Sequence, residues 1–206
     1  LFRSSVLFSS STQAGLDNAY GRSKREAENA LLSWHTRSGG KRYSDRLSGV
    51  FGKWCKPNYN SVVATFCHNI VHDKEISISD PSKSLNLVYI DDVVEEFLKA
   101  LAGEVKENKD NYYQVTQEFH VTLSELSTKL RYIKESRENL LVPNFEEVFD
   151  RNLYATFTSY FDQDDVGYLL DKKSDERGWL AEFIKSEQFG QIYISRTNPG
   201  FTRGIN

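Results

Sequence analysis

Hydrophobic and polar positions follow two different periods along the chain. The apolar run at 6–8 ends in the serine-rich stretch 9–12, which predicts a buried strand that stops at a polar loop. From about 20 to 34, apolar side chains recur at spacings of three and four, which predicts a helix that ends at Gly39–Gly40. Strands that alternate with helices favour an α/β domain with a mostly parallel sheet. Later strands are expected at 43–51, 75–78, 85–90 and 112–115, and later helices at 61–71, 93–101 and 123–133.

The pattern changes after about Val142. Residues 145–160 are rich in aromatic side chains with a helical period, and beyond them that period fades. Turn sequences at 175–178 and 198–200, with an alternating segment at 191–195 between them, predict short β-strands. We therefore expect an incomplete α/β domain at 1–142, a helical connector at 143–165 and the beginning of a β-domain at 166–206.

Composition narrows the class of protein. Of the 206 residues, 39% are hydrophobic and 27% are charged, which is ordinary for a globular protein. The net charge of −3 argues against a nucleic-acid partner, which would require a basic face. No apolar run approaches the length of a membrane span and only two cysteines occur, so we expect a cytoplasmic protein without a membrane partner. The chain opens at Leu1 within an apolar stretch, and we interpret it as a fragment of a longer protein.

Candidate chemistry gathers where the first predicted strand is followed by the first predicted helix. Tyr20 and Lys24 are four residues apart at the start of the helix, so they share a face. An ammonium beside a phenol favours the phenolate and lowers its pKa from about 10, and a phenol tuned in this way can protonate a carbonyl oxygen while a hydride reaches the carbonyl carbon. Ser11 can hydrogen-bond the same oxygen, and Lys24 can also hold a nicotinamide ribose. The three side chains predict a site for carbonyl reduction with a nicotinamide cofactor.

Each of these patterns also has a plainer interpretation. A tyrosine four residues before a lysine is weak evidence in a chain with 11 tyrosines, and Tyr168 and Lys172 repeat the spacing without a serine-ended strand before them. An exposed helix pair is therefore the alternative for the first pair as well. His68 and His72 have a spacing that can hold a metal ion, but no third ligand is evident, so we expect solvated surface and no metal site in this chain. Asp91–Asp92 is expected to cap the helix that follows it.

The order of three motifs resembles a known superfamily. Ser9–Ser11, Tyr20–Lys24 and Tyr89–Val94 follow the motif order of extended short-chain dehydrogenases that act on nucleotide sugars. The segment Phe51–Cys67 closely resembles the capsular polysaccharide synthesis enzyme CapF and its relatives, and residues 175–204 resemble the opening of that family's C-terminal cupin. The resemblance spans nearly the whole chain. It implies an α/β fold, namely the C-terminal part of a Rossmann-type extended short-chain dehydrogenase domain, followed by the first β-strands of a cupin.

The resemblance to the CapF family also implies an activity. The reductase domain would use NADPH to reduce the C4 ketone of a UDP-2-acetamido-2,6-dideoxy-hexulose, on the way to UDP-N-acetyl-L-fucosamine for capsule or O-antigen. The cupin would epimerise C3 of this UDP-activated keto-deoxy amino sugar beforehand, at a zinc site whose ligands lie outside this chain, and the protein would be a homodimer. By the same resemblance, Tyr20 would be the proton donor, Lys24 its activator and ribose ligand, and Ser11 the carbonyl anchor. Contacts with the sugar nucleotide are expected from Asn58, Tyr59 and Asn60.

Two departures from the superfamily pattern keep other functions open. The glycine-rich loop that binds cofactor phosphates is absent from the chain, and Leu85 stands where many extended short-chain dehydrogenases carry an arginine near the nucleotide phosphates. One alternative is a nucleotide-sugar epimerase or dehydratase that retains its cofactor. Another is a non-catalytic nucleotide-binding fragment that kept the fold. Stoichiometric consumption of NADPH would distinguish the reductase from both.

Overall fold

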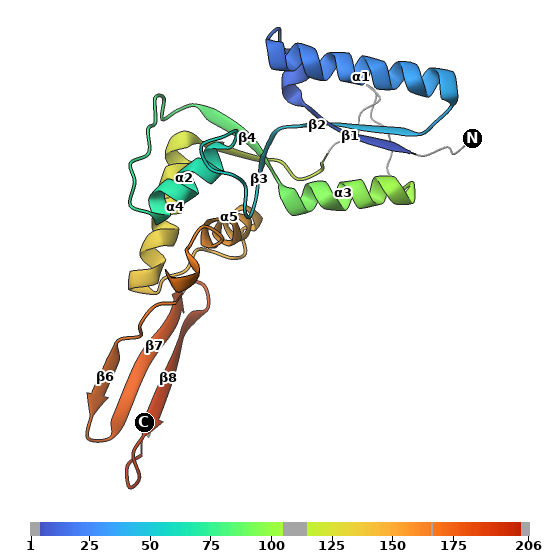
Figure 1. Cartoon of the computed structure of the whole chain (residues 1–206). Coiled ribbons are helices and arrows are strands. Elements are labelled where there is room, and N and C mark those ends of the chain that lie inside the picture. Colours follow the sequence, from blue (N-terminus) through green and yellow to red (C-terminus); the bar gives the residue numbers. More distant parts are fainter. Residues whose placement is uncertain (1–4, 105–114, 166, 203–206) are drawn as a thin grey trace. The chain divides into compact units, whose positions relative to one another are not determined.

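The computed structural model describes residues 5–104, 115–165 and 167–202 (Figure 1). The chain forms two compact units. Unit 1 consists of Leu1–Gly52 and Lys83–Thr122, and unit 2 of Lys53–Ser82 and Leu123–Asn206. Each unit is therefore built from two separate stretches of the chain. Among the described helices, none combines the length and the apolar character needed to cross a bilayer.

Unit 1 begins with a parallel pair of strands joined by a helical crossover, the connection that parallel strands require. Its elements are β1 (Val6–Ser11), the 3₁₀ turn η1 (Thr12–Gly15), α1 (Ala19–Ser38) and β2 (Arg42–Leu47). Gly39 ends α1 in the left-handed conformation with a φ of 64°, a backbone angle that glycine adopts without strain. The strand and the helix expected at the start of the chain are therefore confirmed.

The rest of unit 1 is a second small sheet with one helix. Its elements are β3 (Gly49–Phe51), β4 (Ser84–Tyr89), α3 (Ile90–Ala102) and β5 (Phe119–Thr122). β4 pairs with β3 in parallel and with β5 in the antiparallel sense. Figure 1 shows the β1–β2 pair between α1 and α3, and Leu7 and Tyr43 of this pair pack against Ala100 of α3. Both faces of the first strand pair are thus covered by helices, as in other α/β proteins.

Several expectations for strands are wrong. The strand expected at 43–51 is two strands in different sheets, interrupted at Ser48, whose hydroxyl donates a hydrogen bond to the Glu118 carboxylate. The segment 75–78 forms no strand, because no strand in the described part of the chain lies beside it to complete a ladder. β5 was not expected, since only two of its four residues are apolar. The strand expected at 112–115 lies outside the described residues except for its last residue, which is not in a strand.

Unit 2 packs helices from two distant parts of the chain. They are α2 (Val62–Val71), α4 (Leu123–Asn139), α5 (Val148–Thr158) and the 3₁₀ turn η2 (Gln163–Asp165). Leu126 and Leu130 on α4, and Leu153 and Phe157 on α5, are all 0% exposed. Each pair is four residues apart, so each helix presents one apolar stripe to the core. The helices expected at 61–71 and 123–133 are confirmed, and α4 continues six residues further than its apolar period indicated.

The C-terminal part of unit 2 is an antiparallel sheet in which three strands follow one another in sequence order. They are β6 (Lys172–Asp175), β7 (Gly178–Ser186) and β8 (Gly190–Thr197). The turn at 175–178 requires Gly178, because its φ is 133° and a Cβ there would meet Arg196 O at 1.9 Å. The expected turn and the expected strand at 191–195 are therefore confirmed.

Candidate active site

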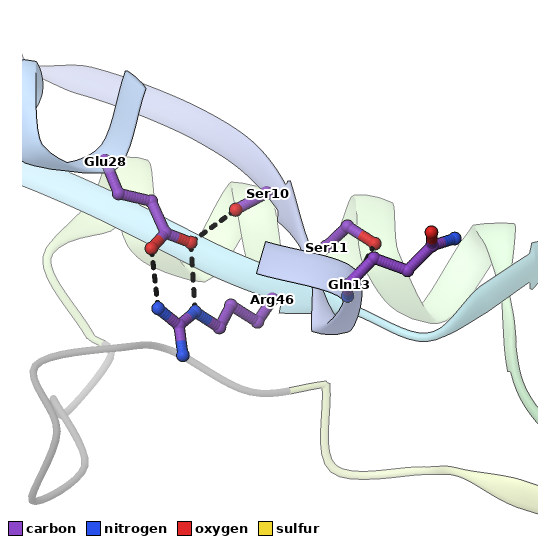
Figure 2. Close-up of polar contacts among 5 residues, drawn as sticks. All are labelled: Ser10, Ser11, Gln13, Glu28 and Arg46. Carbon is purple, nitrogen blue, oxygen red and sulfur yellow. Dashed lines mark hydrogen bonds and ion pairs between the residues drawn. The ribbon is translucent and has the colours of Figure 1, made fainter. Parts of the chain in front are cut away.

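The candidate site begins at the carboxyl end of β1. Ser11 is the last residue of that strand, and its Oγ accepts a hydrogen bond from Gln13 N at 3.2 Å, which caps η1 (Figure 2). Beyond η1, Asn18 caps α1 by accepting a hydrogen bond from Gly21 N at 2.7 Å. Two consecutive side-chain caps thus set the short path from the strand to the helix that carries Tyr20.

Tyr20 and Lys24 lie together on the first turns of α1. Lys24 Nζ donates a hydrogen bond to Ser9 O at 3.0 Å, and it lies 5.7 Å from the centroid of the Tyr20 ring. The Tyr20 side chain is half-exposed, and its hydroxyl makes no hydrogen bond with any residue that the structure describes. The structure therefore brings Tyr20 and Lys24 to the end of the strand that carries Ser11. No hydrogen bond joins Ser11 to Tyr20 within the described part of the chain.

A buried polar group lies directly behind this site and was not indicated by the sequence patterns. Glu28, one helical turn after Lys24, is 4% exposed. Its carboxylate accepts two hydrogen bonds from the Arg46 guanidinium, from Nε at 3.0 Å and from Nη2 at 2.7 Å. Ser10 Oγ donates a further hydrogen bond to the same carboxylate (Figure 2). In the sequence, the group could have been recognised only from the spacing of Glu28, which is a third polar residue on the helical face of Tyr20 and Lys24.

Asp45 and Asp92 are two carboxyl groups of unit 1 whose charged forms are disfavoured by their surroundings. Asp45 on β2 is 5% exposed, and burial, followed by the charge of Glu96, raises its pKa to about 6. Burial also raises the pKa of Asp92, with further contributions from Glu95 and Asp91. Asp92 Oδ2 is buried and has no hydrogen-bond partner among the described residues.

The expectation that Asp91–Asp92 caps a helix is wrong. α3 starts directly at the end of β4, with Tyr89 as its N-cap and without a side-chain cap hydrogen bond. Both aspartates therefore lie inside the first turn, where a negative charge interacts favourably with the helix dipole but the side chain is past the capping position.

The segment with Asn58, Tyr59 and Asn60 belongs to unit 2 and precedes α2. Asn58 has a φ of 54°, a left-handed conformation that asparagine tolerates, and its N donates a hydrogen bond to Thr65 Oγ1 at 3.0 Å. Tyr59 is 74% exposed, and Lys56 Nζ lies 5.8 Å from its ring centroid. The loop is therefore anchored through its backbone while its aromatic and cationic side chains face solvent.

Trp54 extends the same surface. Its side chain is 80% exposed, and Lys53 Nζ lies 5.8 Å from its ring centroid. The residue has a φ of 62°, which is rare for a bulky side chain, and its N donates a hydrogen bond to Ser159 Oγ at 3.3 Å. Strained backbone is commonly retained at functional positions. The exposed Trp54 ring therefore does not pack into the core formed by the described residues.

His68 on α2 and His72, the C-cap residue of that helix, were expected on a solvated surface; their side chains are close together and half-buried. Their ring centroids are 4.3 Å apart, and His72 Nε2 lies 3.4 Å from Asp162 Oδ2. Burial, followed by the neighbouring charges of His72 and Lys74, lowers the pKa of His68. Within residues 5–104, 115–165 and 167–202, no group of three or more histidine, cysteine, aspartate or glutamate side chains is placed to hold a metal ion.

A parallel strand pair with a helical crossover, and with serine, tyrosine and lysine at the strand end, defines a Rossmann-type domain of the short-chain dehydrogenase kind. Residues 7–115 match the sequence model of the NAD dependent epimerase/dehydratase family, and the chain belongs to this family. A nicotinamide cofactor and oxidoreductase chemistry are properties of that family. The expected Rossmann-like α/β fold is thereby confirmed.

Individual relatives agree with this assignment. UDP-2-acetamido-2,6-beta-L-arabino-hexul-4-ose reductase of Pseudomonas aeruginosa is 40% identical over 199 residues, which are 97% of this chain and 53% of that protein. The crystal structure of the capsular polysaccharide assembling protein CapF from Staphylococcus aureus is 39% identical with a TM-score of 0.93, over 98% of this chain and 55% of that one. The resemblance to CapF is therefore confirmed, and the chain spans about half the length of the curated relative that it matches.

A more distant structure supports the fold alone. UDP-glucose 4-epimerase from Thermotoga maritima, solved with UDP-glucose, is 18% identical with a TM-score of 0.59, over 76% of this chain and 63% of that one. At this identity the likeness does not extend to substrate or reaction.

Proposed function

We propose that the complete gene product is an NADPH-dependent reductase of a UDP-activated 4-keto sugar, and that Ser11, Tyr20 and Lys24 carry the reaction. The observation that carries the proposal is the position of Lys24, whose ammonium is tied to Ser9 O at 3.0 Å and lies beside the Tyr20 ring at the end of a parallel strand. The names of two relatives, a UDP-hexulose reductase and CapF, support the substrate class and a role in capsule assembly.

The side chains of this chain fit the nicotinamide end of such a cofactor. An ammonium has three N–H donors, and Lys24 uses one of them on Ser9 O, so two are available for ribose hydroxyls. A bound nicotinamide would supply the hydride that reaches the carbonyl carbon. Tyr20, whose hydroxyl has no partner among the described residues, would donate its proton to the carbonyl oxygen. The Ser11 hydroxyl accepts from Gln13 N, which leaves its own proton free to hydrogen-bond that oxygen.

The substrate that we propose is a UDP-2-acetamido-2,6-dideoxy-hexulose, reduced at C4 and converted in this way toward UDP-N-acetyl-L-fucosamine. We assign Asn58, Tyr59 and Asn60 to contacts with the sugar nucleotide, with Trp54 and Lys56 of the same loop. Exposed rings can stack on a base or a sugar, and exposed ammonium groups attract phosphates, so the exposure of Trp54 and Tyr59 supports this assignment.

We further propose that 1–142 belongs to the reductase domain, 143–165 is a connector and 166–206 begins a cupin domain that epimerises C3. The antiparallel β6–β7–β8 sheet supports a β-domain in this part of the chain. The described residues do not supply a zinc site, and no step proposed for Ser11, Tyr20 and Lys24 involves zinc. A cytoplasmic homodimer stays part of the proposal, and the two free cysteines Cys55 and Cys67 agree with a reducing compartment.

The proposal is tested by the absorbance of NADPH over time, with the complete gene product and a UDP-activated 2-acetamido-4-keto-6-deoxy sugar. A decay that requires the sugar and consumes one NADPH for each sugar reduced is the expected result. Turnover of the sugar without consumption of NADPH would instead identify an epimerase or dehydratase, the functions that the family description also covers.

Tyr20→Phe tests the residue assignment. The variant should bind NADPH normally and lose reduction, because it lacks only the hydroxyl that donates the proton. Tyr168→Phe is the matched control, since Tyr168 also precedes a lysine by four residues but its hydroxyl donates to Phe183 O at 3.0 Å in the other unit. Full turnover by Tyr20→Phe would refute the assignment.

A further inference from the structure

The buried Glu28 carboxylate joins three elements of unit 1. Glu28 lies on α1, Ser10 on β1 and Arg46 on β2, and both partners donate hydrogen bonds to it (Figure 2). Ser10 and Arg46 are direct partners in the parallel register of the two strands. Because side chains at paired positions project from the same face of a sheet, both point toward the helix that carries Glu28.

This group is adjacent to the proposed catalytic residues on both sides of the contact. On the helix, Glu28 follows Lys24 by one turn and Tyr20 by two, so the three side chains form one stripe. On the strand, Ser10 directly precedes Ser11. Lys24 Nζ donates to Ser9 O at 3.0 Å, so α1 is tied to the last residues of β1 at two successive turns.

A gain in the free energy of folding does not by itself explain the pair of Glu28 and Arg46. Glu28 is buried while the Arg46 side chain stays 34% exposed, and removing a carboxylate from water is costly, so well-packed apolar residues at such positions are often equally stable or more stable. Hydrogen bonds, unlike apolar contacts, have a preferred direction, so they further restrict how a helix can slide or rotate on a sheet. A carboxylate that receives three directed hydrogen bonds permits one position of α1 relative to β1 and β2.

We propose that Glu28, Arg46 and Ser10 form a positioning group that holds Tyr20 and Lys24 at the distance from Ser11 that carbonyl reduction requires. The inference rests on the proposed reductase function. None of the three side chains needs to touch substrate or cofactor. They act through α1 and β1, and a displacement of about 1 Å at a reacting group can lower a rate about 100-fold.

The test compares the double variant Glu28→Met/Arg46→Met with the wild type in the complete gene product. We expect a thermal midpoint close to that of the wild type, a kcat lower by about 100-fold, and KM values for NADPH and the keto sugar that change less than about 3-fold. Glu26→Gln, an exposed glutamate on the same helix, is the matched control and should keep the wild-type kcat. A wild-type kcat in the double variant would overturn the proposal, as would a loss of kcat that only accompanies a comparable loss of thermal stability.

Glu28→Gln provides a second test in case the double variant does not fold. Its amide oxygen can still accept from Ser10 or from one nitrogen of Arg46, so an intermediate kcat is expected, with KM again unchanged. A wild-type kcat, or a change in KM alone, would overturn the proposal. Failure of the reductase function itself is recognised separately, because the wild type would then consume no NADPH in the presence of the sugar.

Discussion

Gly21→Ala is a sharp test of the contact between η1 and α1. Gly21 lies between the proposed catalytic residues Tyr20 and Lys24, on the face of the helix that touches η1. A Cβ at this position would lie 2.3 Å from Gln13 O and 2.6 Å from Leu16 O. Both atoms belong to the backbone, so neither can be moved by a change of rotamer.

Two effects of opposite sign determine the result. Alanine is intrinsically better than glycine within a helix by about 1 kcal/mol, which by itself would stabilise the protein. Insertion of a methyl group into a closed contact costs about 1–3 kcal/mol, and here the cost is at the upper end because backbone must move. We therefore expect a net loss of about 2 kcal/mol in the free energy of unfolding. Since the displaced turn of the helix carries Tyr20 and Lys24, kcat should also fall at least about 10-fold.

The assay is urea unfolding together with NADPH-dependent turnover of the keto sugar. Gly15→Ala is the control, because Gly15 lies in the neighbouring η1 turn and nothing lies within 4 Å of the Cβ that it would gain. It should change the unfolding free energy by no more than about 0.5 kcal/mol. A Gly21→Ala protein that is as stable and as active as the wild type would refute the reasoning.

Three further predictions follow from other parts of the structure. Asp45→Asn should raise the thermal midpoint at pH 7. The Asp45 carboxyl has a pKa of about 6 in the folded protein and about 3.9 in the unfolded chain, so the stability of the wild type falls as the pH rises from about 4 to about 6. Melting curves across this pH range should show that the variant lacks this fall. Phe157→Ala should lower the free energy of unfolding by about 3–5 kcal/mol, since the ring is 0% exposed, and urea unfolding that shows a loss below about 1 kcal/mol would contradict this. Lys24→Met should weaken NADPH binding at least about 10-fold in a calorimetric titration, because it removes the ammonium proposed to hold the ribose, and unchanged affinity would count against that role.

Local features of the candidate site were predictable from the sequence because they depend on neighbours along the chain. An apolar run ended by serines, a helix with a three-to-four period and a glycine at its end are sufficient to place β1 and α1. The spacing of Tyr20 and Lys24 puts them on one helical face without knowledge of any other element. The turn at 175–178 was predictable for the same reason, since its glycine is required by a local backbone angle.

Other features could not be predicted because they depend on residues distant along the chain. The segment 43–51 has one continuous pattern, yet it divides at Ser48 because its two halves pair with different strands. The segment 75–78 has a strand pattern but no partner strand among the residues that the structure describes, and β5 forms with few apolar residues because β4 offers it an edge. Asp91–Asp92 has capping chemistry, but the position of the helix start relative to β4 removes that role.

By itself, the sequence predicted the residues proposed here for carbonyl chemistry, with Ser11 at the end of a strand and Tyr20 and Lys24 at the start of a helix. Only the tertiary structure decided that Glu28, which is buried, and Arg46, which is partly exposed, meet behind them although they are 18 residues apart. The physical reason is that helix and strand periods state which face of an element is apolar, whereas the parallel register of β1 and β2 states which residues share a face. A polar residue in a helix pattern is expected to face solvent, and it becomes a buried partner only when a strand pair places a guanidinium and a hydroxyl beneath it.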